Sequence, residues 1–298
     1  MAASSAIGST HAAAPPSFET VRYESVGDGI ARIVMDRPQA RNAQNLRMTY
    51  ELNAAFDLAA QDDSLRVVIL AGADPHFSAG HDLRERQQAA LGRDFPVIGT
   101  WAGFGADGAE GLFAREQEIY LQLTRRWRNF PKPTIAAVQG KCIAGGLMLA
   151  WACDLILASE DAEFCDPVVA MGVCGVEWFA HPWELGPRKA KEMLFTADTW
   201  SAREAERFGM VNRVVPRAEL ADAALAMAER IAAKPAFALK MAKEAVNRSV
   251  DAMGQASAID NAFGLHQLCH AHNMARFGLL VDPAGLPAGV VGRRPASD

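Results

Sequence analysis

The chain has 298 residues, half of them hydrophobic, so it can bury a substantial core in one large domain or two modest ones. Its formal net charge is −5, and no basic run or basic–aromatic stripe is present, which argues against a nucleic-acid partner. The longest apolar stretches, such as residues 143–152, are too short to cross a bilayer and are interrupted by glycine, so no membrane span is expected.

Residues 1–17 are rich in Ala, Ser and Pro and carry almost no charge. A secretory signal would need a basic start and an apolar core, so this segment is expected to be a flexible tail. The number of cysteines is odd, and no CxxC pair occurs, which favours reduced thiols in a cytoplasmic protein. The cysteines are Cys142, Cys153, Cys165, Cys174 and Cys269.

Short apolar runs rich in β-branched residues predict buried strands where Gly, Pro or Asp bound them. Such runs cover residues 30–35, 67–71, 134–138 and 155–158. The segment Leu46–Ala60 repeats apolar residues at the spacing of an amphipathic helix, and a shorter helix is expected over residues 145–152. This alternation predicts an α/β fold with mainly parallel strands and crossover helices.

Beyond Gly186 the pattern is almost entirely helical. An apolar stripe covers residues 220–231, one helix is expected from Pro235 through Arg248, and another from about Ala258 to Phe277. Residues 89–112 differ, with six glycines and several aromatic residues but no clean periodicity. They are interpreted either as a mobile lid over a pocket or as a surface insertion.

Two glycine-rich turns are the most informative motifs of the chain. They are residues 77–83, FSAGHDL, and residues 143–147, IAGGL. Turns built from glycine and small residues let backbone N–H groups point into a cleft with no side chain in the way. Two N–H groups that converge on one carbonyl oxygen form an oxyanion hole, which stabilises negative charge on that oxygen.

With these motifs, the chain resembles the crotonase family, also called the enoyl-CoA hydratase/isomerase family, from about Val21 to Val250. Further matching pieces are DRP at 36–38, NA at 42–43, PTIAAV at 133–138, CDL at 153–155 and FGMVN at 208–212. The resemblance implies a crotonase-type α/β fold, with a core of repeated ββα turns over residues 18–215. A helical region over residues 216–298 would form the contacts of a trimer or a dimer of trimers.

The family resemblance also implies an acyl-CoA thioester as the ligand, with no cofactor beyond the coenzyme A of the substrate. The N–H groups of His81 and Gly145 would hold the thioester oxygen. Backbone near that oxygen would come from Ser78, Ala79, Gly80 and Gly146. Basic groups must meet the phosphates of coenzyme A, and Arg41 is the first candidate, with Arg84 a weaker one.

Two positions depart from the family pattern. Family hydratases hold and activate one water with two glutamates, and the matching substrate-site positions here are Met148 and Val168. Neither side chain can exchange a proton, and each general acid or base is worth about 10²–10⁴ in rate. Efficient hydration by the usual route is therefore not expected.

Asp166 and Glu177 are the candidates for a replacement carboxylate, with Asp166 the first choice. Asp166 lies two residues before Val168, so both side chains face one side of an extended segment, which Pro167 favours. Some isomerase-like and dehalogenase-like members carry a carboxylate at the position that matches Val176, one residue before Glu177. A turn cap at Asp166 and a solvated surface glutamate at position 177 remain the structural alternatives.

Histidines offer two further possibilities. An imidazole suits acid–base work near neutral pH, so the His81 ring is a candidate for it, but it could equally stack over coenzyme A or turn away. His266 and His270 lie one helical turn apart, with His272 close by, as metal ligands can. No third ligand stands at a diagnostic spacing, so no metal site is predicted.

Three functions remain open from the sequence. The leading one is an enoyl-CoA hydratase/isomerase-type enzyme that stabilises a thioester enolate, in fatty-acid or related acyl-CoA metabolism. The second is a double-bond isomerase, which needs one base instead of two carboxylates. The third is an acyl-CoA binding protein that kept the oxyanion hole and lost the chemistry.

Overall fold

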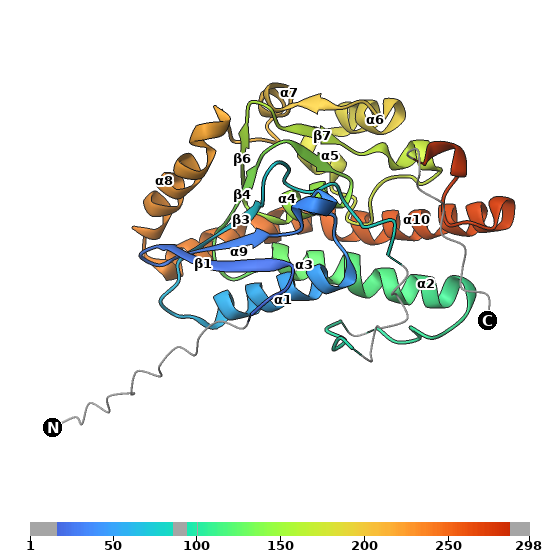
Figure 1. Ribbon diagram of the computed structural model, residues 1–298, viewed down its shortest axis with the longest axis horizontal. Helices are drawn as coiled ribbons and strands as arrows, with labels where there is room; N and C mark the ends of the chain where they lie inside the picture. The colour runs from blue at the N-terminus through green and yellow to red at the C-terminus, as the bar shows by residue number, and fades with distance from the viewer. Residues whose placement is uncertain (1–16, 86–93, 100, 287–298) are drawn as a thin grey trace.

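The computed structural model describes residues 17–85, 94–99 and 101–286 (Figure 1). Its centre is a six-stranded sheet with the strand order β1-β2-β3-β4-β6-β9. The first pair of strands is antiparallel and each later pair is parallel. The strands are β1 (Val21–Gly27), β2 (Ile30–Met35), β3 (Val67–Gly72), β4 (Thr134–Val138), β6 (Leu155–Ser159) and β9 (Arg213–Val215).

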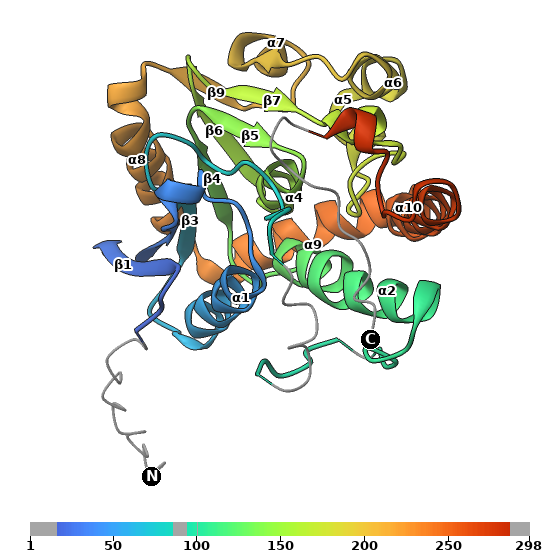
Figure 2. The same ribbon diagram turned by 45° about the vertical axis from the view of Figure 1, so that its right-hand side comes forward.

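Helices cover both faces of this sheet, as Figure 2 shows. Successive strand residues point to opposite faces. Ile69 and Ala137 pack under α8 (Leu220–Ala232), whereas their neighbours Leu70 and Ala136 belong to the larger core on the other face. That larger core is closed by α1 (Leu46–Gln61), α3 (Leu123–Arg128) and α4 (Gly145–Ala152).

A second, three-stranded sheet carries the edge of the candidate site. It is formed by β5 (Lys141–Ile143), β7 (Glu163–Cys165) and β8 (Trp200–Ser201). The first two strands are parallel and the last pair is antiparallel. An isolated bridge between Ser78 and Cys142 joins the loop after β3 to this sheet.

A long helix crosses beside the site and changes its geometry midway. It begins as α2 (Gly108–Glu116), widens into a π-helical turn over Gln117–Gln122, and continues as α3. Single π turns inside α-helices are rare and often occur at functional sites. The remaining helices are α5 (His181–Leu185), α6 (Pro187–Thr196), α7 (Ala202–Arg207), α9 (Ala236–Ala252) and α10 (Gln255–Phe277).

The predicted α/β arrangement with mainly parallel strands is confirmed. The strands at 30–35 and 134–138 and the helix at 145–152 have the predicted bounds, and the other predicted elements differ by a few residues at their ends. The short strands β1, β5, β7, β8 and β9 were not predicted. The tail at 1–17 lies outside the described residues except for Ser17. None of the described helices is both long and apolar enough to span a membrane.

Candidate active site

The two glycine-rich turns lie against each other. Ser78 donates its N–H to the carbonyl of Lys141 at 2.9 Å, and its own carbonyl accepts from the N–H of Ile143 at 3.0 Å. Residues 77–83 therefore continue the small sheet beside β5, and α4 begins directly after that strand. The two motifs are thus hydrogen-bonded to each other through Ser78.

Glycines allow this close approach. Gly80 has φ +90°, and a Cβ there would lie 2.7 Å from the carbonyl oxygen of Ile143 and 3.2 Å from the Gly145 nitrogen. A Cβ on Gly146 would lie 2.6 Å from the Ser78 carbonyl oxygen. Ala144, between the strand and the helix, is held at φ 48° and ψ −110°, a conformation that L-residues adopt only under constraint. A side chain at either glycine would push the two backbones apart.

The amides of His81 and Gly145 are unpartnered within the described part of the chain. Neither N–H donates to a backbone or side-chain acceptor there. The Gly145 N–H is at the first turn of α4, where the backbone amides of a helix have no intrahelical partner and the helix dipole is positive. Both amides are thus available to a ligand. Their joint action on one oxygen remains a prediction.

Buried polar side chains hold the first turn in place. The Ser78 hydroxyl donates to the Asn42 carbonyl at 2.8 Å, and the Asn42 amide donates to the carbonyls of Ala73 and His76, both at 2.7 Å. Arg37 pairs with Asp82 at 3.1 Å. The matching motifs DRP and NA therefore serve to position the His81 segment.

The imidazole ring of His81 lies inside the candidate site. It stacks on Tyr120, from the π-helical turn, with ring centroids 3.8 Å apart. Its Nε2 is 3.0 Å from a carboxylate oxygen of Glu177, and a Cβ on Gly145 would lie 2.7 Å from its Nδ1. Nδ1 is buried and has no hydrogen-bond partner. The ring therefore bridges the backbone turn and Glu177.

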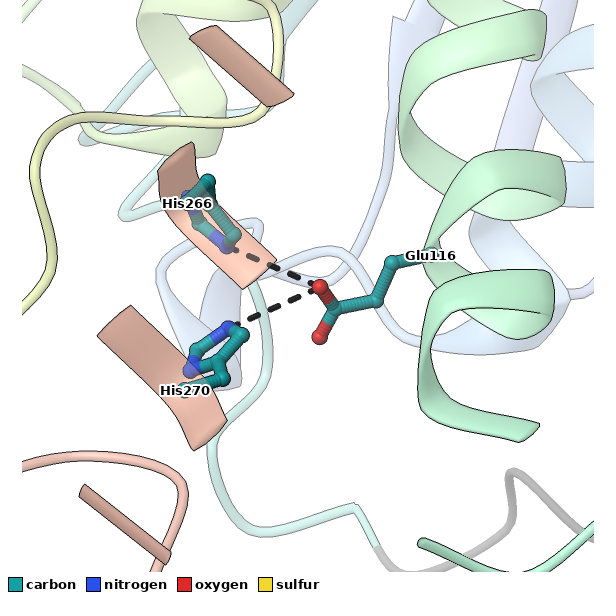
Figure 3. A group of neighbouring side chains, drawn as sticks. All are labelled: Glu116, His266 and His270. Carbon is teal, nitrogen blue, oxygen red and sulfur yellow. Dashed lines mark ion pairs between the residues drawn. The ribbon is translucent and has the colours of Figure 1, made fainter. Parts of the chain in front are cut away.

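Glu177 is buried and belongs to a polar cluster. Its second oxygen lies 3.7 Å from Nε2 of His266, and that nitrogen is 3.6 Å from the carboxylate of Glu116. The same Glu116 oxygen is 3.5 Å from Nε2 of His270. Figure 3 shows Glu116 reaching from α2 towards the two histidines of α10. The surface position considered for Glu177 is wrong, because the side chain is 6% exposed.

Charges in this cluster shift the pKa values of its members. Burial raises the pKa of Glu177, but the neighbouring His81 and His266 outweigh this and lower it. Burial lowers the pKa of His266, while Glu177 and Glu116 raise it to about 9. The Glu116 pKa is held well below its usual range, since His270 and His266 outweigh its burial. Both carboxylates are therefore anions at neutral pH.

Asp166 is fully buried, and its carboxylate has three polar partners. Its carboxylate lies 2.8 Å from Nε2 of His181, and it accepts the N–H groups of Val176 at 3.1 Å and Val168 at 3.3 Å. Asp166 therefore caps the turn that starts at Pro167, as the structural alternative predicted. It also anchors the residue next to Glu177. The Asp166 carboxylate is occupied by these structural contacts, so Glu177 becomes the stronger candidate.

The remaining predicted site residues are either buried in the core or exposed at the surface. Met148 and Val168, the positions predicted to match the hydratase glutamates, are both buried in the large core. Arg41 is exposed, and its carbonyl accepts the N–H of Ala79 at 3.0 Å, which places its backbone beside the His81 turn. Arg84 is also exposed.

The described part of segment 89–112 packs against the site helices. The buried carboxylate of Glu118 accepts the N–H groups of Ile98 at 2.6 Å and Gly99 at 2.7 Å, and the Tyr50 hydroxyl at 3.1 Å. The Phe95 ring stacks on Tyr50 with centroids 5.0 Å apart. Residues 89–93 and 100 of the proposed lid lie outside the described residues.

Sequence reasoning missed Glu116, Glu118 and Tyr120. Their signal was present, because residues 111–121 contain two glutamates inside an otherwise largely apolar helix. A buried carboxylate needs a partner, so each glutamate indicated a polar contact across the core. The partners come from distant segments, which the local spacing could not identify.

Sequence comparison with known proteins supports the resemblance to the enoyl-CoA hydratase/isomerase family. The family model for enoyl-CoA hydratase/isomerase matches residues 25–96 and 104–280. EchA13 of Mycobacterium tuberculosis, which is named as a candidate enoyl-CoA hydratase, is 50% identical over 263 residues, covering 87% of this chain and 83% of that protein. A "Probable enoyl-CoA hydratase" of Rhizobium meliloti is 36% identical over 239 residues, covering 79% of this chain and 84% of that protein.

Solved structures of enoyl-CoA hydratase-type proteins have a fold similar to that of this chain. The crystal structure of a probable enoyl-CoA hydratase from Mycobacterium smegmatis has a TM-score of 0.78 at 49% identity and covers 88% of this chain and 98% of its own. An enoyl-CoA hydratase/isomerase from Xanthobacter autotrophicus Py2 has a TM-score of 0.75 at 33% identity, covering 90% and 91%. These matches confirm the crotonase-type α/β fold. By motifs, fold and sequence identity, the chain belongs to the enoyl-CoA hydratase/isomerase family.

Proposed function

We propose that this protein acts on an acyl-CoA thioester, that the N–H groups of His81 and Gly145 stabilise the enolate oxygen, and that the His81–Glu177 pair transfers the proton. The observation that carries the proposal is the 3.0 Å contact between His81 Nε2 and Glu177, next to the Gly145 turn. It supplies a carboxylate-held base where both usual glutamates are missing.

The proton positions follow from the chemistry of the two groups. The Glu177 carboxylate is an anion and can only accept, so Nε2 of His81 carries the hydrogen of this bond. In the neutral ring, Nδ1 then has a free lone pair. Nδ1 lies 2.7 Å from the position of a Cβ built on Gly145, so in the proposed mechanism it would take the proton from the carbon next to a thioester carbonyl held at that turn. A base oriented by a third group is the usual arrangement for proton transfer.

Exchange of the α-proton tests the proposal without knowledge of the natural substrate. Saturated acyl-CoAs of several lengths are incubated with the protein in D2O, and deuterium at the α-carbon is measured by mass spectrometry. Binding of the same compounds is measured by calorimetry. Exchange above the buffer rate is expected. Binding of acyl-CoA with neither exchange nor turnover of any enoyl-CoA would replace the proposal with the binding-protein alternative.

Hydration of crotonyl-CoA is expected to be slow. Because Met148 and Val168 replace both water-activating glutamates, the rate should lie at least about 10²–10⁴-fold below that of a family hydratase that has both. The affinity for crotonyl-CoA should persist, because backbone groups hold the thioester. Loss of absorbance from the conjugated double bond measures hydration. A rate equal to that of such a hydratase would contradict the argument from the missing carboxylates.

Double-bond isomerisation is the second candidate, favoured by the single base in the site. Moving a double bond from the β,γ to the α,β position needs removal of one α-proton and its return at the γ-carbon, which one group can perform. Turnover of 3-enoyl-CoA faster than hydration of the matching 2-enoyl-CoA would favour it. The reverse ratio would favour hydration.

Arg41 is the proposed contact for the phosphates of coenzyme A. Its backbone lies beside the His81 turn, and its exposed guanidinium pairs with no carboxylate in the described residues. Lys141 and Arg217 lie nearby, since all three cations lower the pKa of His76, after the larger effect of burial. Lys141 pairs with Glu163, and Arg217 with two aspartates, which leaves Arg41 the more available cation.

We also propose a trimer-based assembly through the C-terminal helices. No residue of α9 is buried in the single chain, although it carries Phe237, 74% exposed, and Val246, 64% exposed. Met253, Leu265 and Leu268 add to the exposed apolar surface on and next to α10. A surface of this kind is typical of a subunit interface.

The double substitution Phe237→Glu and Val246→Glu is expected to reduce the oligomer to smaller species, because charges would be buried in the contact. Light scattering coupled to gel filtration measures the mass. Gln61→Glu, on the exposed end of α1, serves as the control and should leave the mass unchanged. A stable monomer in the unmodified protein at micromolar concentration would contradict the proposal.

A further inference from the structure

Three buried side chains, from α2 and α10, point towards one another (Figure 3), and one of them, His266, lies 3.7 Å from Glu177 of the candidate site. Nε2 of His266 lies 3.6 Å, and Nε2 of His270 3.5 Å, from the same oxygen of Glu116. These three ligand atoms all lie within 4.8 Å of one another. His266 and Glu116 are each only 5% exposed, and His270 is 7% exposed. Nitrogen and oxygen atoms thus face a common point in the interior.

The outer nitrogens of both rings are already committed. Nδ1 of His266 lies 2.8 Å from the carbonyl of Gly175, and Nδ1 of His270 lies 2.7 Å from the carbonyl of Leu280. A carbonyl can only accept, so Nδ1 carries the hydrogen in both rings. A metal ion would displace the Nε2 protons, and both Nε2 lone pairs would then point towards Glu116. Fixing a ligating histidine through its other nitrogen is the common outer-shell arrangement at metal sites.

The distances from the two Nε2 atoms to the Glu116 oxygen match ligands of a shared cation better than they match hydrogen bonds. A charged N–H···O contact has a length of about 2.7–2.9 Å, well below the 3.5 and 3.6 Å observed. Two ligand atoms at about 2.1 Å from a tetrahedral zinc ion are about 3.4 Å apart. Nε2 of His266 is also buried with no hydrogen-bond partner. Both nitrogen–oxygen separations are therefore close to those between ligands of one ion.

We propose that Glu116, His266 and His270 bind a divalent transition-metal ion, with zinc the best match. Two imidazoles and one carboxylate are a donor set that suits zinc, whereas calcium and magnesium prefer oxygen alone. Gln267 donates to the ligating oxygen of Glu116 at 2.6 Å and so orients the carboxylate. This site revises the expectation of a metal-free protein, because the third ligand comes from α2, far away in sequence.

The site adjoins the acyl-CoA site without depending on it. Glu177 uses one oxygen for His81 and presents the other 3.7 Å from Nε2 of His266. An ion at the cluster would therefore tie α2 to α10 directly behind Glu177. Three protein ligands leave a fourth position, which water or Glu177 can take. The alternative, a cluster of protonated histidines and carboxylates that binds no metal, is an outcome of the test.

Zinc binding is measured on the full-length protein after removal of metals with a chelator and dialysis. Competition against a chromophoric zinc indicator gives the affinity and stoichiometry. One tightly bound zinc per chain is expected. Glu116→Gln and His270→Gln should each weaken binding by at least about 100-fold, since each removes one of three ligands. His272→Gln, an exposed histidine on the same helix, is the matched control and should bind like the unmodified protein.

Two further measurements guard against misfolded variants. Zinc, but not magnesium, should raise the Tm of the unmodified protein, because a ligand that binds only the folded state stabilises it. Cobalt should give the visible absorption of a tetrahedral site with nitrogen ligands, and Glu116→Gln should lose it. If zinc neither binds the metal-free protein nor raises its Tm, the proposal is overturned. Equal affinities of the unmodified protein and of folded Glu116→Gln and His270→Gln overturn it as well.

Discussion

Replacing Glu177 with glutamine is expected to lower turnover of enoyl-CoA by about 10²–10⁴-fold and to leave acyl-CoA affinity near its normal value. The amide cannot act as the anionic partner of His81 Nε2, so the ring loses both its orientation and its charge support. In the proposed mechanism backbone groups hold the substrate, and the substitution does not touch them. Steady-state kinetics and calorimetry on the same preparation separate the two effects.

Asp166→Asn is the matched control, since it removes a second buried carboxylate that also faces a histidine. It should lower the Tm, because a buried charged contact to His181 is lost. Turnover per folded molecule should fall far less than in Glu177→Gln. Loss of turnover in Asp166→Asn at unchanged stability, with normal rates in Glu177→Gln, would return the catalytic role to Asp166.

Gly80→Ala is expected to cost about 10²–10³-fold in turnover, the usual effect of losing one oxyanion donor. The residue has φ +90°, and its new Cβ would meet the carbonyl oxygen of Ile143 at 2.7 Å, so the backbone must move. That movement displaces the adjacent N–H of His81 from its place beside Gly145. Deuterium exchange at the α-carbon should fall in parallel with turnover.

Gly264→Ala provides the comparison, because that glycine lies within α10 and nothing stands within 4 Å of its Cβ position. The substitution should leave turnover unchanged and slightly favour the helix, by about 0.5–1 kcal/mol. Equal turnover in the two alanine variants would show that the His81 turn does not hold the thioester oxygen.

Sequence patterns predicted the central elements because local rules govern them. β4 is a continuous buried run, and α4 is a short apolar stretch that begins with a glycine pair. The short strands β5 and β7 escaped prediction, since three residues carry too little pattern and their pairing joins distant segments. The two glycine-rich turns were recognisable because each position that requires glycine is visible in the sequence itself.

The polar part of the site could be predicted only in fragments. His81, Glu177 and the α10 histidines were each visible in the sequence, but their mutual contacts depend on how three segments meet in the core. The spacing to Val168 favoured Asp166 over Glu177. In the fold, however, the Asp166 carboxylate contacts His181 and accepts two backbone N–H groups. Asp166 and Glu177 carry the same chemical group. Their surroundings in the fold, which no local sequence pattern encodes, decide which of them is the better catalytic candidate.

The π-helical turn at Gln117–Gln122 gives this protein a simple evolutionary route to gaining or losing the Glu116 cluster. Losing one residue there would let a regular α-helix form and rotate α2 against α3 by about 100°. Glu116 would then turn away from His266 and His270, while the contacts of α3 with the core stayed in place. Loss or gain of a single codon can therefore remove or add the Glu116 cluster in one step, so descendants of a common ancestor can differ in it while sharing the same glycine-rich turns.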